Sequence, residues 1–131
     1  MTMFGLPFRL LAPAPLRGAS AKKFGIETAR HYLLRFMLYV VPVRSQWRKK
    51  VPAINHADNT ARPQLVFEAG NPLYYRLIKS FYQKTGVPLV LNTSFNLRGE
   101  PIVASPADAY STFIRSGIDV LVMGNFVCEK W

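Results

Sequence analysis

Polar side chains crowd into the segment that follows residues 87–91, an apolar stretch that the sequence predicts to be a short buried strand. The segment contains Asn92, Thr93, Ser94, Asn96 and Arg98. One Asn or Gly is enough to reverse a chain, so the excess of donors indicates a binding site. Hydroxyl, amide and guanidinium groups beside free backbone N–H groups suit an anion, and phosphate is the natural candidate. A polar turn whose side chains satisfy one another is the alternative.

A second loop, residues 55–64, carries an imidazole, a carboxylate, a guanidinium and several amides. His56 and Asp58 have no third ligand at a useful spacing, so we expect no metal site. We favour a hydrogen-bonded pair in which Asp58 orients His56 or Arg62 toward a substrate, with a purely structural loop as the alternative. The single cysteine, Cys128, allows no intrachain disulfide, and we expect it to be buried rather than nucleophilic.

Alternating strands and helices must position these two loops. The sequence predicts strands at residues 35–43, 64–68, 87–91 and 118–123, one helical turn at residues 45–50 and a final segment at residues 125–131. This alternation indicates an α/β or α+β domain in which helices pack on a mixed sheet. A ligand would then bind beyond the carboxyl end of a strand, where the Ser94 segment lies.

Two helices have clear local signals. Asn71 can cap a helix over residues 71–86 that ends at Gly86, and Ser105 with Asp108 forms a capping box at the start of the second. For the first helix, the predicted buried face consists of Tyr74, Leu77, Ile78 and Phe81. For the second, it consists of Tyr110, Phe113 and Ile114.

Charge is unevenly distributed along the chain, whose net charge is +10. Residues 1–57 contain ten Lys or Arg against one acid, a net charge of +9, whereas residues 58–131 contain seven against six, a net charge of +1. The densest basic cluster is Arg44, Arg48, Lys49 and Lys50, beside Trp47. We expect this cluster to be solvated or to contact an acidic neighbour, because no recognised nucleic-acid motif accompanies it.

The 131 residues fit a single domain, residues 1–131. No apolar run approaches the roughly 18 to 20 residues of a membrane-spanning helix. With one cysteine, the expected setting is the reducing cytoplasm. The absence of a long apolar run argues against a membrane partner. The absence of a recognised nucleic-acid motif beside the basic cluster argues against a nucleic-acid partner.

The two loops, in this order, resemble the C-terminal region of the carbamoyltransferases that modify nodulation factors and antibiotics. The matching segments are residues 7–13, 40–48, 52–64, 86–102, 105–109 and 117–126. The family's His-x-Asp-Gly-Thr loop and its Asn-Thr-Ser-Phe-Asn segment, followed by Gly-Glu-Pro, recur at similar separations. Here Asn59 stands where the family has glycine, and Asn tolerates a positive φ better than most residues.

The resemblance implies a YrdC-like fold that uses ATP, with Mg²⁺ carried by the nucleotide, to convert carbamoyl phosphate into carbamoyl adenylate. It implies that Arg62 and Arg9 are anion clamps and that His56 lines the same pocket, with Arg62 and His56 as the catalytic pair. The residues that it implies for binding nucleotide or phosphate are Ser94, Asn96, Thr93 and Arg98.

Complete members of the family carry a large N-terminal domain of the actin-like ATPase fold, for which this chain has no room. We therefore expect a truncated domain that is incomplete at its N-terminal edge and inactive or inefficient alone. A separate actin-like ATPase-fold subunit is a possible partner, and the acceptor in the complete enzyme is a small-molecule hydroxyl. The alternatives are a non-catalytic partner or gene remnant, and a basic nucleic-acid-binding module.

Overall fold

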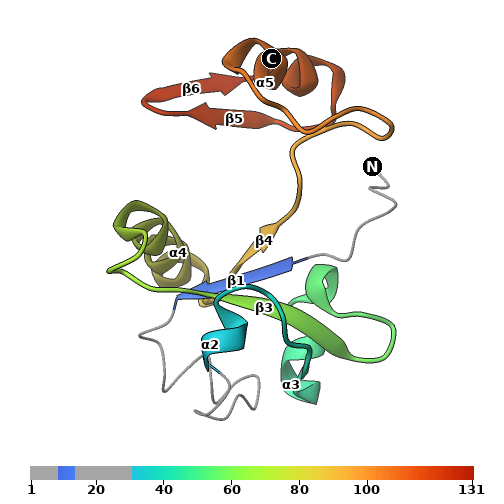
Figure 1. Cartoon of the computed structure of the whole chain (residues 1–131), viewed down its shortest axis with the longest axis vertical. Helices are drawn as coiled ribbons and strands as arrows, with labels where there is room; N and C mark the ends of the chain where they lie inside the picture. Colours follow the sequence, from blue (N-terminus) through green and yellow to red (C-terminus); the bar gives the residue numbers. More distant parts are fainter. Residues whose placement is uncertain (1–8, 14–30) are drawn as a thin grey trace. The chain divides into compact units, whose positions relative to one another are not determined.

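The computed structural model describes residues 9–13 and 31–131, which contain both helices and strands (Figure 1). These residues form two compact units, one made of Arg9–Pro13 and residues 31–93 and the other of Ser94–Trp131. The predicted mixed α/β class is confirmed. The sequence has mixed helical character over residues 21–34; its described part, His31–Leu34, is helical, and the remainder lies outside the described residues.

The first unit is built on a four-stranded sheet with the order β2-β3-β1-β4. Its strands are β1 (Arg9–Pro13), β2 (Val41–Pro42), β3 (Thr60–Val66) and β4 (Val90–Asn92). β1 pairs with β3 in parallel, whereas the β1–β4 and β2–β3 pairs are antiparallel. The sheet is therefore mixed, as predicted.

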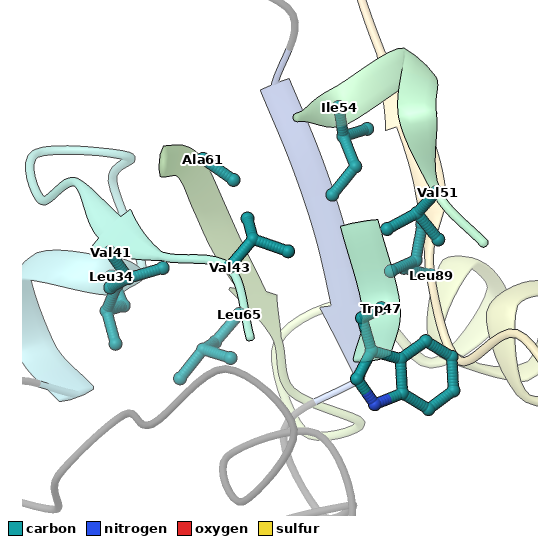
Figure 2. Close-up of a cluster of buried hydrophobic side chains, with 9 residues drawn as sticks. All are labelled: Leu34, Val41, Val43, Trp47, Val51, Ile54, Ala61, Leu65 and Leu89. Atoms are coloured by element: carbon teal, nitrogen blue, oxygen red, sulfur yellow. The ribbon is translucent and has the colours of Figure 1, made fainter. Parts of the chain in front are cut away.

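One face of this sheet carries the main hydrophobic core. Successive side chains of a strand point to opposite faces, and on β3 the buried residues Ala61, Pro63 and Leu65 alternate with half-buried polar ones. Helices α2 (His31–Leu34), α3 (Ser45–Arg48) and the 3-10 turn η2 (Pro52–Ile54) supply the facing side chains. The cluster consists of Leu34, Val41, Val43, Trp47, Val51, Ile54, Ala61, Leu65 and Leu89 (Figure 2).

Helix α4 (Pro72–Thr85) packs on the opposite face at the carboxyl end of β3. Its predicted ends are confirmed: the Asn71 side chain accepts a hydrogen bond from the Tyr74 N–H, and Gly86 stops the helix with a φ of 71°. Tyr75 and Ile78 form a second core cluster with Val66. This small contact covers only part of the face.

The predicted buried face of α4 was partly wrong. Leu77 and Phe81 are 56% and 41% exposed, while Tyr75 is buried beside Ile78. Among the described side chains of the sheet, Val66 and Val90 pack with this helix.

Two strand predictions also need correction. Residues 35–43 do not form one strand: a turn follows α2, Met37 has a φ of 57°, and β2 spans only Val41–Pro42. A left-handed residue interrupts an extended chain despite the strand-favouring side chains around it. β3 begins at Thr60 rather than at residue 64. Only Thr60 and Ala61 of β3 pair with β2. Pro63, two residues further along β3, has no backbone N–H to donate to a neighbouring strand.

The second unit packs helix α5 (Pro106–Arg115) against a hairpin of β5 (Val120–Met123) and β6 (Phe126–Glu129) (Figure 1). The predicted capping box is confirmed, and Gly124, with a φ of 58°, occupies the first turn position of the hairpin, as type II′ turns require. The outer face of the hairpin exposes the cross-strand pair of Val122 and Val127.

The core of the second unit is formed by Ala109, Phe113 and Leu121. Tyr110 and Ile114, which the sequence predicted to be buried, are about half exposed. The helix turns its small residues toward the hairpin instead. In the described part of the chain, no helix is both long and apolar enough to cross a membrane.

Candidate functional site

The strand register brings three polar residues of the first unit into one line. Arg9 of β1 is the partner of Arg62 on β3 and also of Asn92 on β4. Cross-strand partners lie on the same face of a sheet, here the face that α4 covers only in part. We call Arg9, Arg62 and Asn92 the polar row.

The polar row sets two arginines at opposed positions of the β1–β3 register. The side chain of Arg62 is half buried, and it forms no ion pair with any described residue. The ion pair found among the described residues joins Arg115 to Glu100.

A tight loop leads His56 to the edge of the same face. The His56 N–H donates to the Thr60 carbonyl at 2.8 Å, and the Asn59 N–H donates to the His56 carbonyl at 2.9 Å. Asn59 has a φ of 62°, the left-handed position of a three-residue hairpin loop. Asn59 thus adopts a positive φ, which Asn tolerates better than most residues.

Asp58 acts on His56 through a third residue. Its Oδ1 accepts hydrogen bonds from the Thr60 N–H at 3.0 Å and the Thr60 hydroxyl at 2.7 Å. The side-chain bond, followed by the backbone bond, lowers the pKa of the Asp58 carboxyl. Thr60 Oγ1 in turn lies 3.2 Å from His56 Nδ1. The direct orienting contact expected from the sequence is therefore replaced by a contact through Thr60.

A cavity of about 390 Å³ adjoins the polar row. Asn92 and Gln64 line it, together with Asn71 and Tyr74 at the first turn of α4. The Gln64 side chain donates to the Arg35 carbonyl at 3.0 Å, which fixes its amide. Sequence reasoning missed this cavity because Asn71 and Tyr74 were explained as a helix cap and as core.

The Ser94 segment divides between the two units. Asn92 and Thr93 belong to the first, whereas Ser94, Asn96 and Arg98 belong to the second. Thr93 is exposed. Ser94 is half buried, and within the described residues its hydroxyl has no hydrogen-bond partner.

Asn96 has a structural task. Its amide donates to the carbonyls of Leu97 and Glu100, each at 3.1 Å, and the Glu100 N–H donates to the Leu97 carbonyl. With Gly99 at a φ of 84°, this is a type II turn, and the exposed Arg98 occupies its second position. Asn96 therefore fits the alternative interpretation of this segment, a polar turn whose side chains form hydrogen bonds within the turn.

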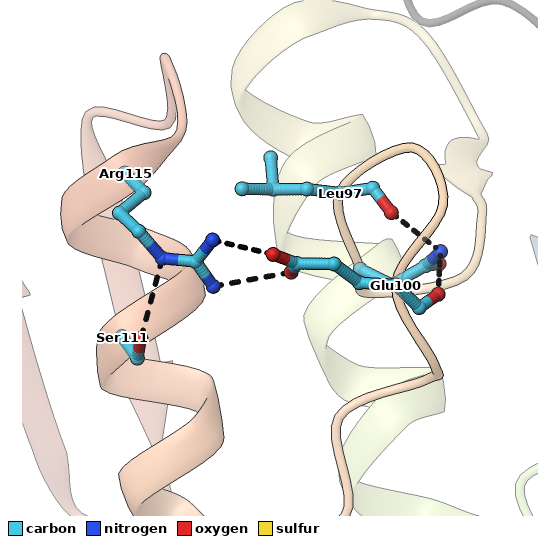
Figure 3. Close-up of polar contacts among 5 residues, drawn as sticks. Leu97, Glu100, Ser111 and Arg115 are labelled. Carbon is cyan, nitrogen blue, oxygen red and sulfur yellow. Dashed lines mark hydrogen bonds and ion pairs between the residues drawn. The ribbon is translucent and has the colours of Figure 1, made fainter.

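An ion pair ties this turn to α5. The Glu100 carboxylate accepts hydrogen bonds from both terminal nitrogens of Arg115, while Arg115 Nε donates to the Ser111 hydroxyl at 3.3 Å (Figure 3). The hydrogen bond from Arg115 holds the pKa of Glu100 below its ordinary value of 4.5, and the carboxylate raises the pKa of Arg115.

Glu100→Gln is expected to lower the melting temperature at neutral pH and to have little effect in acid. A carboxyl whose pKa is depressed on folding contributes stability above its unfolded pKa, and that stability is lost as the pH falls through the lower, folded value. The difference from wild type should therefore shrink below about pH 4.5. Thermal melts between pH 7 and pH 3 measure it. Glu129→Gln, which removes an exposed carboxylate, is the control, and a pH-independent difference would contradict the pair's role.

Part of the basic cluster makes local contacts. Arg48 Nε donates to the Val43 carbonyl at 2.9 Å, and Lys50 Nζ lies 5.1 Å from the centre of the Trp47 ring. Whether the cluster is solvated or contacts an acidic neighbour stays a prediction.

Comparison with known proteins identifies the family. The family model Carbamoyltransferase C-terminus matches residues 6–130. The chain is 42% identical to nodulation protein NolNO of Sinorhizobium fredii over 123 residues, which cover 94% of this chain and 18% of that protein. It is 40% identical to nodulation protein NolO of Bradyrhizobium diazoefficiens, covering 94% of this chain and 22% of that protein.

A third relative is named as an O-carbamoyltransferase. The chain is 34% identical to 3'-hydroxymethylcephem-O-carbamoyltransferase of Amycolatopsis lactamdurans over 90 residues, which cover 69% of this chain and 17% of that protein. The chain thus spans about a fifth of the length of these curated relatives. The match over nearly all of its residues confirms the resemblance, and the chain belongs to the carbamoyltransferase C-terminal family.

Proposed function

We propose that this carbamoyltransferase module binds ATP and carbamoyl phosphate and forms carbamoyl adenylate. The observation that carries the proposal is the register of Arg9 and Arg62 beside Asn92. Acyl phosphate and triphosphate repel each other, and preorganised cations offset that repulsion most where charge develops in the transition state.

The reaction balances as follows. Water releases inorganic phosphate from carbamoyl phosphate, an oxygen of the resulting carbamate bonds to the α-phosphorus of ATP, and pyrophosphate leaves. Arg62 and Arg9 would stabilise the phosphoryl oxygens, and His56 would contact the carbamoyl end. By family resemblance, the nucleotide contacts would come from Ser94, Asn96, Thr93 and Arg98.

The acceptor half of the reaction is also a proposal. One relative is named as an O-carbamoyltransferase of a hydroxymethyl group, which supports a small-molecule hydroxyl as the acceptor in the complete enzyme. Transfer to that hydroxyl would require an actin-like ATPase-fold part, either joined to this module or supplied as a separate subunit.

Ser94→Ala is expected to weaken ATP binding by about 1.5 to 3 kcal/mol, the value of one hydrogen bond to a charged group. The half-buried hydroxyl has no hydrogen-bond partner among the described residues, so it is available to a phosphate oxygen. Calorimetric titration of ATP into both proteins measures the difference, with Ser80→Ala on the exposed surface of α4 as the matched control. Equal affinities of wild type and Ser94→Ala would remove Ser94 from the site.

A second candidate function is non-catalytic docking on a separate carbamoyltransferase chain. Leu73, Leu77 and Phe81 are 77%, 56% and 41% exposed, and their spacing of four residues puts them on one face of α4. Sedimentation of this chain mixed with the N-terminal part of the Sinorhizobium relative would test it. Association that Leu77→Asp abolishes would support docking, and separate sedimentation would reject it.

A further inference from the structure

Two hydrogen bonds determine which nitrogen of His56 carries a proton. The Thr60 hydroxyl has one hydrogen, which it donates to the ionised Asp58 carboxylate at 2.7 Å. An ionised carboxylate can only accept. The Thr60 oxygen must therefore accept in its 3.2 Å contact with His56, so Nδ1 is the protonated nitrogen of the imidazole.

The other nitrogen is then a bare acceptor. In a neutral imidazole protonated at Nδ1, Nε2 offers only a lone pair. His56 Nε2 is buried and has no hydrogen-bond partner among the described residues, and the same holds for Oδ1 of the neighbouring Asn55. Buried acceptors without partners are rare because they lose the hydrogen bonds of water, so each of these atoms requires a donor.

The position of Thr60 connects this acceptor to the polar row. Thr60 and Arg62 are two residues apart on β3 and therefore on the same face of the strand. That face thus holds an anion-binding group at Arg62 and an acceptor of N–H donors at His56. Carbamoyl phosphate combines the two matching groups, because it has a phosphate at one end and an NH2 at the other.

We propose that Thr60 and Asp58 are positioning residues that hold His56 Nε2 as an acceptor for the NH2 of the carbamoyl group. Through this acceptor the module selects carbamoyl phosphate over acetyl phosphate. The inference rests on the proposed function. Acetyl phosphate has a methyl group in place of the NH2, so it would leave His56 Nε2 without a donor. Thr60 thereby determines substrate specificity without touching the substrate.

The tautomer can be measured without any ligand. In ¹⁵N spectra of the imidazoles of the 131-residue chain, His56 should show a protonated Nδ1 and an unprotonated Nε2 near neutral pH. Thr60→Val, which replaces the hydroxyl with a methyl group and suits a strand, should shift His56 toward the tautomer protonated at Nε2. Thr60→Ser should keep the wild-type spectrum. A protonated Nε2 in wild type, or no change in Thr60→Val, would overturn the assignment.

Specificity is measured by titrating carbamoyl phosphate and acetyl phosphate separately into wild type, Thr60→Val and Thr60→Ser. Wild type should prefer carbamoyl phosphate by about tenfold to a hundredfold, the cost of leaving a buried acceptor unpaired. Thr60→Val should lose most of this preference, and Thr60→Ser should retain it. Equal binding of both phosphates to wild type would overturn the specificity and leave the proposed function standing. Binding of neither would reject the proposed function and this inference together.

Discussion

Phe113→Ala is expected to lower the free energy of unfolding of the second unit by about 3 to 5 kcal/mol, the usual loss when a buried phenylalanine is truncated. Phe113 is 1% exposed and packs with Ala109 and Leu121 at the centre of the unit's core. Lys130 Nζ also lies 4.9 Å from the centre of its ring. Since folded proteins are stable by only about 0.05 to 0.15 kcal/mol per residue, a loss of this size is comparable to the whole stability of so small a unit.

Ile114→Ala is the matched control, because the next residue of the same helix is 51% exposed. Its effect should stay within about 0.5 kcal/mol, as is usual for surface changes. Urea titration followed by amide resonances of residues 31–93 and 94–131 separately would report on each unit. Equal losses for the two variants would contradict the packing of α5 described above.

Arg62→Gln is expected to weaken binding while leaving the stability of the ligand-free protein nearly unchanged. The affinities for ATP and carbamoyl phosphate should fall by about 1.5 to 3 kcal/mol each, through loss of a charged hydrogen bond. The free energy of unfolding in phosphate-free buffer should stay within about 0.5 kcal/mol of wild type, because Arg62 forms no ion pair with any described residue.

Calorimetry and denaturant titration of the same samples measure both quantities. Arg76→Gln is the matched control. It removes an equal charge from the exposed surface of α4, outside the polar row, and should bind ATP and carbamoyl phosphate as wild type does. ATP should stabilise wild type more than Arg62→Gln at equal concentration, since ligand binding to the folded state adds stability. Reduced stability with unchanged affinity would show that Arg62 is structural.

The helices were predictable to the extent that their signals are local. Asn71 with Gly86, and Ser105 with Asp108, fix helix ends through contacts within a few residues, and the structure confirms them. The buried faces were less predictable. On α5, hydrophobicity favoured Tyr110 and Ile114 over Ala109 and Thr112, yet the smaller pair is buried. Close packing against the hairpin, which sequence alone does not show, selects small side chains.

The candidate site was harder to predict because its residues are aligned by strand pairing. Arg9 and Arg62 are opposed across two strands that are distant in the sequence, and no spacing rule gives their register. The Asp58 to His56 contact was anticipated from proximity alone. The intervening Thr60 was missed because the sequence placed it within the polar loop of residues 55–64, and only the structure shows that it begins β3.

The hairpin of the second unit also bears on how the protein behaves at high concentration. β5 and β6 pair only with each other among the described strands, and Val122 and Val127 expose an apolar outer face. Unpaired strand edges beside apolar side chains are templates for intermolecular strand addition. Aggregation of this protein would therefore begin at the hairpin, and a lysine at Val127 would protect the chain without altering the Phe113 core.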